Sequence, residues 1–462
     1  MKTTVLLGLD KWLDGEPRAG DVVGRVRQLA LPAADDPRQP HPSPQSQVIL
    51  IPTGAEAYQS VDLEPGTYLI DAVLPSGDIA SQTFTVGESG DPVQVWLRGG
   101  YSPHEWLSWQ HLMGNVALKS KGFVKSAAAF SGDRSPRWVL RVLASPVDKT
   151  RGDEVTHLLD KHLSSLASSG TPPSPEPIRR VGDQQLTRAE PPYQNVDGAY
   201  RSYVFPMDDH FDGTRAYLVL EENQQQLLLA VLPTPWLQSD HSSRVAKADV
   251  LVGPSLRHSS DARRQGDGPA ASMSIVIRDP AMATVIGYFG SGDEPAAATV
   301  LEKAEDLLLE KLENPLAAAA GAYVLLSNWR GGKGTYEPAW FSWIENLMNW
   351  FPWLPDGAIQ RAWLARLTGR SPGATREPFL EGFRRGISYY SAGVRILLDG
   401  LTLLAHDART NRWHDEELED ALASTQRLAL QTDPRQPFTT IQLPQQLGQS
   451  TRGHGELMGA TR

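Results

Sequence analysis

The fold of the C-terminal half is decided by one stretch, Asn314-Pro-Leu-Ala-Ala-Ala-Ala-Gly-Ala-Tyr-Val-Leu-Leu, which ends at Leu326. Asparagine followed by proline is typical of a helix start. The asparagine side chain accepts a backbone hydrogen bond there, and proline has no amide hydrogen that needs a partner. The small side chains from Ala317 to Ala322 permit a second helix to approach closely. The stretch therefore predicts a helix inside a closely packed helical domain.

Helical periodicity continues on both sides of this stretch. Leu301 and Leu308 share a helix face before it, and helices are predicted over Val394–His406 and His414–Leu430 after it. Several helices with short connections indicate a bundle or a short α-solenoid. We therefore assign residues 293–432 to one Trp-rich helical domain.

Tryptophans are concentrated in this domain, and six of the 13 lie between Trp329 and Trp363. Large aromatic side chains at helical spacing are most simply explained as helix core, since each buries roughly 150–250 Å². The alternative is a partner-binding surface, where tryptophan is enriched. Trp353 lies between two prolines, off the predicted helices, and is the better candidate for an exposed anchor. The candidate partner-binding residues are Trp353, Trp340, Trp343 and Trp350.

The rest of the chain is rich in short β-type runs separated by turn residues. Residues 1–100 predict an N-terminal antiparallel β-sandwich of the immunoglobulin-like or prealbumin-like type, because runs such as Thr67–Leu74 alternate two sets of side chains between turns. Residues 193–292 predict a second β domain, so the fold class is α+β and multidomain. The other predicted units are a mixed α/β extension at 101–168, a Pro-rich linker at 169–192 and a disordered tail at 433–462.

Composition restricts the possible functions. The 462 residues include no cysteine, which excludes disulfides, thiolate metal sites and a cysteine nucleophile on this chain. The net charge of −10 and the lack of long basic runs argue against nucleic-acid binding. The apolar run near the N-terminus is too short for a signal peptide, and no apolar stretch is long enough for a membrane span. We expect a cytoplasmic protein without a membrane partner.

Motifs for catalysis are incomplete. Gly331-Gly-Lys-Gly-Thr lacks the spacing of a phosphate-binding loop, and a connection between helices explains it better. Asp208-Asp209-His210-Phe-Asp212 offers metal or acid–base ligands but lacks calcium-loop spacing, which favours a solvated turn. We predict no catalytic residue, no metal and no cofactor. The sequence leaves enzymatic activity open and favours a non-enzymatic protein.

Arginines in two polar segments are candidate protease sites, because a protease binds its substrate in an extended form and polar loops permit that form. An ordinary solvated linker is the alternative interpretation for each. The candidate cleavage residues are Arg179, Arg180 and Arg188 in the Pro-rich linker, and Arg263 and Arg264 in a loop of the second β domain.

The stretch beginning at Asn314, together with Asn349-Trp-Phe-Pro-Trp-Leu-Pro-Asp-Gly-Ala, resembles a block in uncharacterised bacterial proteins. Those proteins are encoded beside caspase-like peptidases in defence or conflict loci, and the resemblance covers residues 314–363. It implies a non-enzymatic interaction protein that is a partner or substrate of such a peptidase. Because bacterial relatives of caspases often cut after basic residues, cleavage at the linker arginines would separate the β modules from the helical part.

Two other functions remain open at this point. A carbohydrate-binding or carbohydrate-active protein would use the β-sandwich and the tryptophans for sugar stacking. A structural assembly subunit would use the helical domain to contact other proteins.

Overall fold

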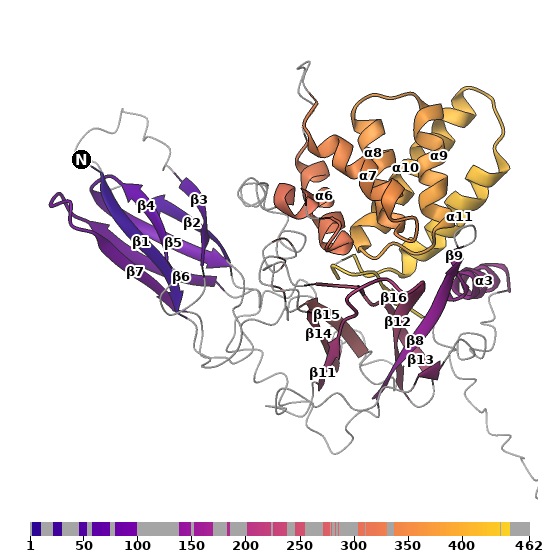
Figure 1. The fold of residues 1–462 in the computed structure, drawn as a ribbon, viewed down its shortest axis with the longest axis horizontal. Helices are drawn as coiled ribbons and strands as arrows, with labels where there is room; N and C mark the ends of the chain where they lie inside the picture. Colours follow the sequence, from indigo (N-terminus) through magenta and orange to yellow (C-terminus); the bar gives the residue numbers. More distant parts are fainter. Residues whose placement is uncertain are drawn as a thin grey trace, which may run out of the picture.

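A computed structural model describes most of the chain outside its connecting segments. The described residues are 2–10, 22–29, 46–52, 58–73, 79–98, 138–148, 152–169, 183–184, 201–222, 225–237, 245–254, 271–277, 279, 282, 285, 304–309, 311–329, 337–434 and 436–443. The structure confirms the predicted α+β multidomain class, with strands in the N-terminal part, further strands after them and helices toward the C-terminus (Figure 1).

The N-terminal module is built from two sheets. Its strands are β1 Thr3–Asp10, β2 Val22–Gln28, β3 Ser46–Ile51, β4 Gln59–Leu63, β5 Gly66–Val73, β6 Ile79–Val86 and β7 Val93–Arg98. The sheets have the orders β4-β1-β7 and β3-β2-β5-β6. One pairing departs from the predicted antiparallel sandwich, because β1 and β7 run parallel.

This module has a core of its own. Alternate residues of β2, such as Val22 and Val26, are buried, whereas Arg25 and Arg27 between and beyond them are partly exposed. Such alternation is what a sheet with one buried face requires. The module reaches the larger unit through Val23 and Leu50, which are paired on β2 and β3 and pack against the larger core.

A second group of strands forms two more sheets. The first has the order β10-β8-β12-β13-β16, with β9 paired to β8, and the second has the order β11-β14-β15. The strands are β8 Trp138–Asp148, β9 Gly152–Asp153, β10 Asp183–Gln184, β11 Arg201–Pro206, β12 Thr214–Glu222, β13 Gln225–Val231, β14 Lys247–Pro254, β15 Ala271–Ile277 and β16 Thr440–Gln442. Helix α3, Glu154–Ser169, follows β9 directly.

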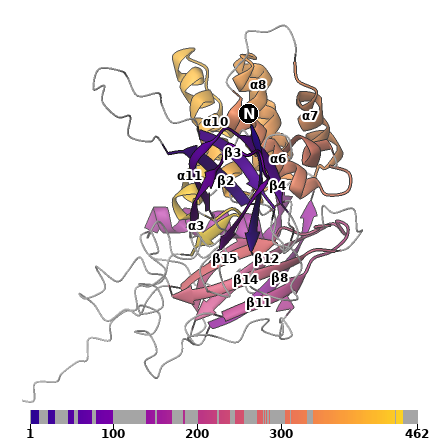
Figure 2. The same cartoon turned by 90° about the vertical axis from the view of Figure 1, so that its left-hand side faces the viewer.

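The helices lie on one side of these sheets, as both overall views show (Figures 1 and 2). They are α6 Pro315–Asn328, α7 Trp340–Trp350, α8 Pro355–Leu367, α9 Pro372–Arg384, α10 Ser391–Thr410 and α11 Glu416–Gln431. The predicted start of α6 is confirmed, since the Asn314 side chain accepts a hydrogen bond from the amide of Ala317. The small residues of α6 permit a close approach of neighbouring backbone, since a Cβ at Gly321 would lie 2.6 Å from the carbonyl oxygen of Ala304.

Sheets and helices share one hydrophobic core. It extends from Leu140 on β8 through the helices to Leu443 after β16. Residues from both ends of this part of the chain meet in the sheet, because β8 pairs with β12 and β16 pairs with β13. We call residues 138–443 the sheet–helix body. Among the described residues, no helix has both the length and the apolar character that crossing a membrane requires.

The predicted boundaries need correction in three places. Residues 138–169 of the expected mixed extension belong to the sheet–helix body, whereas 101–137 lie outside the described residues. Within the expected linker, Asp183–Gln184 pair with β8. The expected tail contributes β16, because Phe438 and Ile441 are buried and carry that short segment into the core.

Candidate functional site

The connection between α9 and α10, residues 385–390, is where the parts of the sheet–helix body meet. Arg385 at its start is buried and donates hydrogen bonds to three carbonyl oxygens, those of Met348 at 3.1 Å and Phe351 at 3.3 Å at the end of α7 and that of Leu354 at 3.2 Å just before α8. The last carbonyl groups of a helix have no partners within it, so a guanidinium there satisfies them. Arg385 thus fixes α7 to the connection.

Arg215 on β12 joins the sheet to the same connection. Its guanidinium is fully buried and donates to Asp153 Oδ2 at 3.2 Å, to the carbonyl of Ile387 at 3.0 Å and to the carbonyl of Trp353 at 3.0 Å. It also lies 4.8 Å from the centroid of the Tyr389 ring. One side chain of the sheet therefore binds the α7–α8 loop, the α9–α10 connection and the residue that precedes α3.

The carboxylate of Asp153 is held by several groups. It accepts hydrogen bonds from the Tyr217 hydroxyl at 2.7 Å and from the amide of Thr156 in the first turn of α3 at 3.0 Å. Burial, and then the charge of Asp153, raise the pKa of Tyr217 well above its usual value of 10.0, so this hydroxyl stays a donor. Gly386 has a φ of +101°, and a Cβ there would lie 3.1 Å from Arg215 Nη1. The cluster leaves no room for a larger residue.

A second buried carboxylate, Asp356 in the first turn of α8, binds the same α9–α10 connection. It accepts hydrogen bonds from the Tyr323 hydroxyl at 2.8 Å, the Tyr389 amide at 2.9 Å and the Ser388 hydroxyl. Burial raises the pKa of Asp356, and these hydrogen bonds oppose that rise. Among the described residues it has no ion-pair partner, and the positive ends of α8 and α10 supply the compensating field.

These two clusters are enclosed and structural in character. Arg215, Asp153, Tyr217 and Asp356 are all buried among the residues that bind them. Their hydrogen bonds are directed at backbone groups and at each other, which fixes segments of the chain relative to one another. The arrangement supports a rigid body and presents none of these groups to a reactant.

The predicted tryptophans occupy different environments. Trp340 is buried, with its ring edge-to-face against Trp329 and Phe341. The expectation that Trp353 is the exposed anchor is not met. Its ring is partly buried and stacks on Phe211 with a centroid distance of 4.3 Å. Of the four predicted tryptophans, the exposed one is Trp350, with 50% of its surface accessible at the end of α7.

Lys311 connects Trp350 with Trp343. Its Nζ lies 5.1 Å from the Trp350 ring centroid and 5.9 Å from that of Trp343. Lys311 precedes the exposed Leu312 in the turn before α6, and Leu309 nearby is also exposed. We call the group formed by Leu309, Lys311, Leu312, Trp343 and Trp350 the Trp350 surface. It brings two of the predicted partner-binding tryptophans together.

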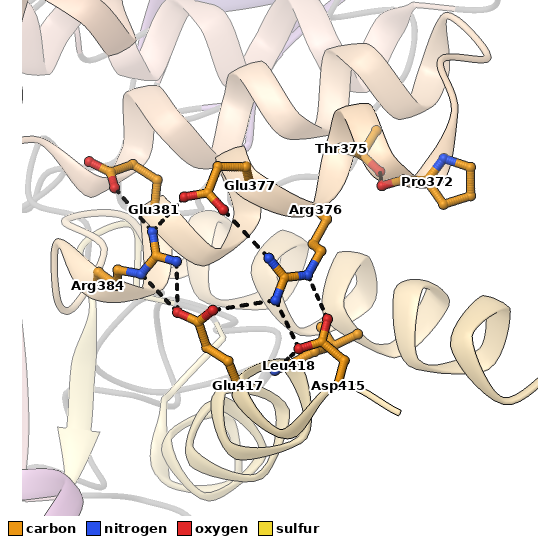
Figure 3. A network of polar contacts seen from close by, with 9 residues as sticks. All are labelled: Pro372, Thr375, Arg376, Glu377, Glu381, Arg384, Asp415, Glu417 and Leu418. Carbon is orange, nitrogen blue, oxygen red and sulfur yellow. Dashed lines mark hydrogen bonds and ion pairs between the residues drawn. The ribbon is translucent and has the colours of Figure 1, made fainter. Parts of the chain in front are cut away.

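The polar network between α9 and α11 is partly exposed. Arg376 donates to both carboxylate oxygens of Asp415 and to Glu417 (Figure 3). Arg384 donates to Glu417 and to Glu377. Ion pairs that solvent can reach contribute little to the free energy of folding individually. Here both arginines of α9 donate to Glu417 of α11, and this shared carboxylate links the two helices.

Other predicted sites can be placed only in part. The candidate cleavage residues Arg179, Arg180, Arg188, Arg263 and Arg264 and the glycine-rich segment 331–335 lie outside the described residues. In the acidic turn, the carboxylate of Asp208 accepts a hydrogen bond from the Thr234 hydroxyl and that of Asp212 from the Thr214 amide. Within the described part of the chain, no cluster of three or more histidine or acidic side chains is arranged to hold a metal ion.

The residues of the two buried clusters carried little signal in the sequence. Asp356 follows Pro355 at the start of a helix, where an acidic residue is expected for its interaction with the helix dipole. Its role in binding the distant Tyr323 and Ser388 could not be read from that position. Arg215 and Asp153 are 62 residues apart, and neither belongs to a recognisable motif.

Comparison with known proteins gives one match. A family described as the Y4kD C-terminal domain is similar to residues 284–445 of the chain. The matched region contains α6 to α11, the Trp350 surface, Asp356 and β16, and it ends before the last residues. No curated protein matches the chain. No solved structure matches it either.

Proposed function

We propose that this chain is an interaction protein of a bacterial defence system, acting in the cytoplasm as a substrate or partner of a caspase-like protease. The observation that carries the proposal is the Trp350 surface, inside the region similar to the Y4kD C-terminal domain. Trp350 is half exposed there, and Leu309 and Leu312, which lie within two residues of Lys311 in the chain, are exposed as well. Tryptophan is enriched among residues that dominate binding energy, and clustered exposed apolar residues mark interaction sites.

The rigid body behind this surface supports a binding role. Because α7 is fixed by Arg385 and the α7–α8 loop by Arg215, Trp350 at the end of α7 is held on a preorganised support. A preorganised surface loses less conformational entropy when a partner binds. The buried clusters therefore serve the surface indirectly, by positioning α7.

A binding experiment tests the partner role. The purified full chain is titrated with the peptidase encoded beside it, and the affinity is measured by calorimetry. Trp350→Ala is expected to weaken binding by at least ~2 kcal/mol, as truncation of a hot-spot residue does. Trp413→Ala is the matched control, because Trp413 is also an exposed tryptophan but lies in the turn after α10. Equal affinities for wild type and Trp350→Ala would remove the proposed surface.

The shared core changes what cleavage would do. Cuts at Arg179, Arg180 or Arg188, or at Arg263 or Arg264, fall between segments that contribute to one core. We therefore expect the products to stay associated after cleavage instead of separating into β and helical parts. The N-terminal module, whose core is separate, would remain attached through the chain that precedes β8.

Native and denaturing analysis of the same digest tests this. The chain is incubated with the peptidase, the ends are mapped by mass spectrometry, and the products are run on size exclusion with and without urea. We expect fragments that elute together in buffer and separate in urea. An intact chain after incubation would refute the cleavage proposal. A variant with all five candidate arginines changed to alanine serves as the control for cleavage at other sites. Fragments that separate in buffer would contradict the shared-core argument.

A further inference from the structure

Tyr389 belongs to both buried clusters, and its hydroxyl group has no partner. Its amide donates to Asp356 at 2.9 Å, and its ring centroid lies 4.8 Å from Arg215 Cζ. The residue is fully buried, yet its hydroxyl forms no hydrogen bond with any group in the described part of the chain. The adjacent Tyr390, buried as well, donates its hydroxyl hydrogen to the carbonyl of Leu316 at 2.7 Å. The unpartnered hydroxyl of Tyr389 is therefore an exception that requires an explanation.

Arg215 has one unpartnered donor in the same cluster. Its Nη1 donates to Asp153 and to the carbonyl of Ile387, and its Nη2 donates to the carbonyl of Trp353. Its Nε is buried too, but it has no acceptor among the residues that the structure describes. The N–H groups of a guanidinium are fixed in one plane. The N–H of Nε therefore cannot turn toward another acceptor while the other hydrogen bonds hold.

The two unpartnered donors lie beside each other. The guanidinium of Arg215 lies over the Tyr389 ring. Burial raises the pKa of Tyr389, and the charge and the N–H groups of Arg215 oppose that rise. Buried donors for which the chain supplies no acceptor are typically bound by ordered water, because a hydrogen bond left unmade in the interior costs free energy of folding. The pair of donors thus indicates a small ligand that accepts two hydrogen bonds.

The charges around the two donors decide between water and an ion. The charge of Arg215 is compensated by Asp153, and the charges of Asp153 and Asp356 both raise the pKa of Tyr389. An anion would add a negative charge beside these two carboxylates, which is unfavourable in an interior of low dielectric constant. A metal cation would meet hydrogens instead of lone pairs. Water accepts from both donors, and the carbonyl of Trp353, which binds Nη2, has a second lone pair for a hydrogen of the water.

We propose that the sheet–helix body holds one buried water molecule between Arg215 Nε and the Tyr389 hydroxyl. The water accepts a hydrogen bond from each group and so joins Arg215 of the sheet to the head of a side chain in the α9–α10 connection. Its role is to complete the Arg215 cluster, which fixes that connection and the α7–α8 loop. The site goes beyond the proposed function, because it requires no partner protein.

Two neighbouring tyrosines permit a matched test in the full chain. Tyr389→Phe and Tyr390→Phe each remove the hydroxyl of a fully buried ring, and Tyr390 is the benchmark for a hydroxyl with a direct partner. If the water is bound, Tyr389→Phe should raise the equilibrium constant for unfolding in urea roughly three- to tenfold, as the loss of a hydrogen bond does. A buried hydroxyl without any partner destabilises the fold, so its removal would not. A Tyr389→Phe variant as stable as wild type, or more stable, would overturn the proposal.

A crystal structure of the wild-type full chain tests the site without any variant, at a resolution that shows ordered water. We expect one solvent peak at about 2.7–3.2 Å from both Arg215 Nε and the Tyr389 hydroxyl oxygen. A second crystal soaked in sodium bromide should show no anomalous peak at this position. Absence of the solvent peak would overturn the proposal. An anomalous bromide peak would also overturn it, because the site would then bind an anion instead of water.

Discussion

Two cations lie over aromatic rings in this protein, and their surroundings differ. Arg215 is buried, lies over Tyr389 and has a carboxylate partner and two carbonyl acceptors. Lys311 lies over Trp343 and Trp350 and has none of these. A buried cation with an anionic partner stabilises the fold. Its removal leaves that partner as a buried, uncompensated charge, which lowers the free energy of unfolding. A cation held by ring contacts alone leaves no buried partner behind when it is removed, so its removal should cost less free energy of unfolding.

The largest expected effect is that of Arg215→Met. It leaves the Asp153 carboxylate buried without its cation, and removal of one partner of a buried ion pair typically costs about 3–5 kcal/mol. Urea unfolding should show this loss in the transition of the sheet–helix body. The transition of the N-terminal module should not move, because its core is separate.

A double variant makes the same test more specific. Asp153→Asn keeps an oxygen for the Thr156 amide while removing the charge. Combined with Arg215→Met, it should recover a substantial part of the lost free energy of unfolding. Strict additivity of the two single effects would show that the ion pair is not what couples the sheet to the helices.

The next effect comes from Gly386→Ala, which tests how tightly the Arg215 cluster is closed. Its φ of +101° disfavours an alanine, and the new Cβ would lie 3.0 Å from Thr156 Oγ1. We expect a loss of about 2–4 kcal/mol in urea unfolding, from backbone strain plus displacement of the cluster. Gly369→Ala is the control, since its φ is +73° but nothing lies within 4 Å. Equal losses at both positions would mean that only backbone strain acts.

A smaller effect is expected from the partly exposed network that joins α9 to α11. Hydrogen bonding to Arg376 lowers the pKa of Asp415, opposed by burial. A lowered folded-state pKa gives stability that is present above the unfolded value of about 3.9 and is lost as the pH falls through the folded-state value. Arg376→Met should therefore cost at most about 1 kcal/mol at pH 7, discounted for exposure.

Urea unfolding at pH 7 and at pH 2–3 measures this difference. The difference in free energy of unfolding between wild type and Arg376→Met should become smaller at acid pH, because protonated Asp415 no longer pairs with the arginine. A gap that is unchanged at acid pH would show that Arg376 acts by packing. Arg361→Met provides a comparison, since its partner Glu345 is mostly exposed.

Lys311 should show the smallest effect and the opposite pH dependence. Its pKa is lowered by burial, so the folded state disfavours the charged form at neutral pH. That penalty is relieved as the pH rises from the folded-state pKa toward the unfolded value of about 10.4. Wild type should therefore gain stability relative to Lys311→Met between neutral pH and pH 10, measured by urea unfolding. A relative loss over this range would mean that the charged lysine is favoured in the fold.

Local features of the fold could be predicted from the sequence, because they depend on neighbouring residues. Asn314 and Pro315 mark the start of α6, and the alternating residues of β2 and β5 indicate strands. The apolar and aromatic pattern also identified the helical part. These signals arise from capping, proline geometry and periodicity, which act over a few residues.

Long-range contacts could not be predicted in this way. The pairing of β16 with β13 brings a short segment of an apparently polar tail into the sheet. Trp353 and Trp350 are three residues apart, yet the first is covered by Phe211 from a distant turn and the second is exposed. The Arg215 cluster likewise combines residues from β12, the start of α3 and two interhelical connections. Only the tertiary structure brings these together.

The comparison of the two cations is tested most directly by making the same change at both. Arg215→Met and Lys311→Met each replace a cationic head by an unbranched apolar side chain. Their free energies of unfolding should be measured together in urea at pH 7. We expect a loss of about 3–5 kcal/mol for Arg215→Met and no loss, or a small gain, for Lys311→Met. Losses of similar size would contradict it, because Lys311 would then be as structural as Arg215.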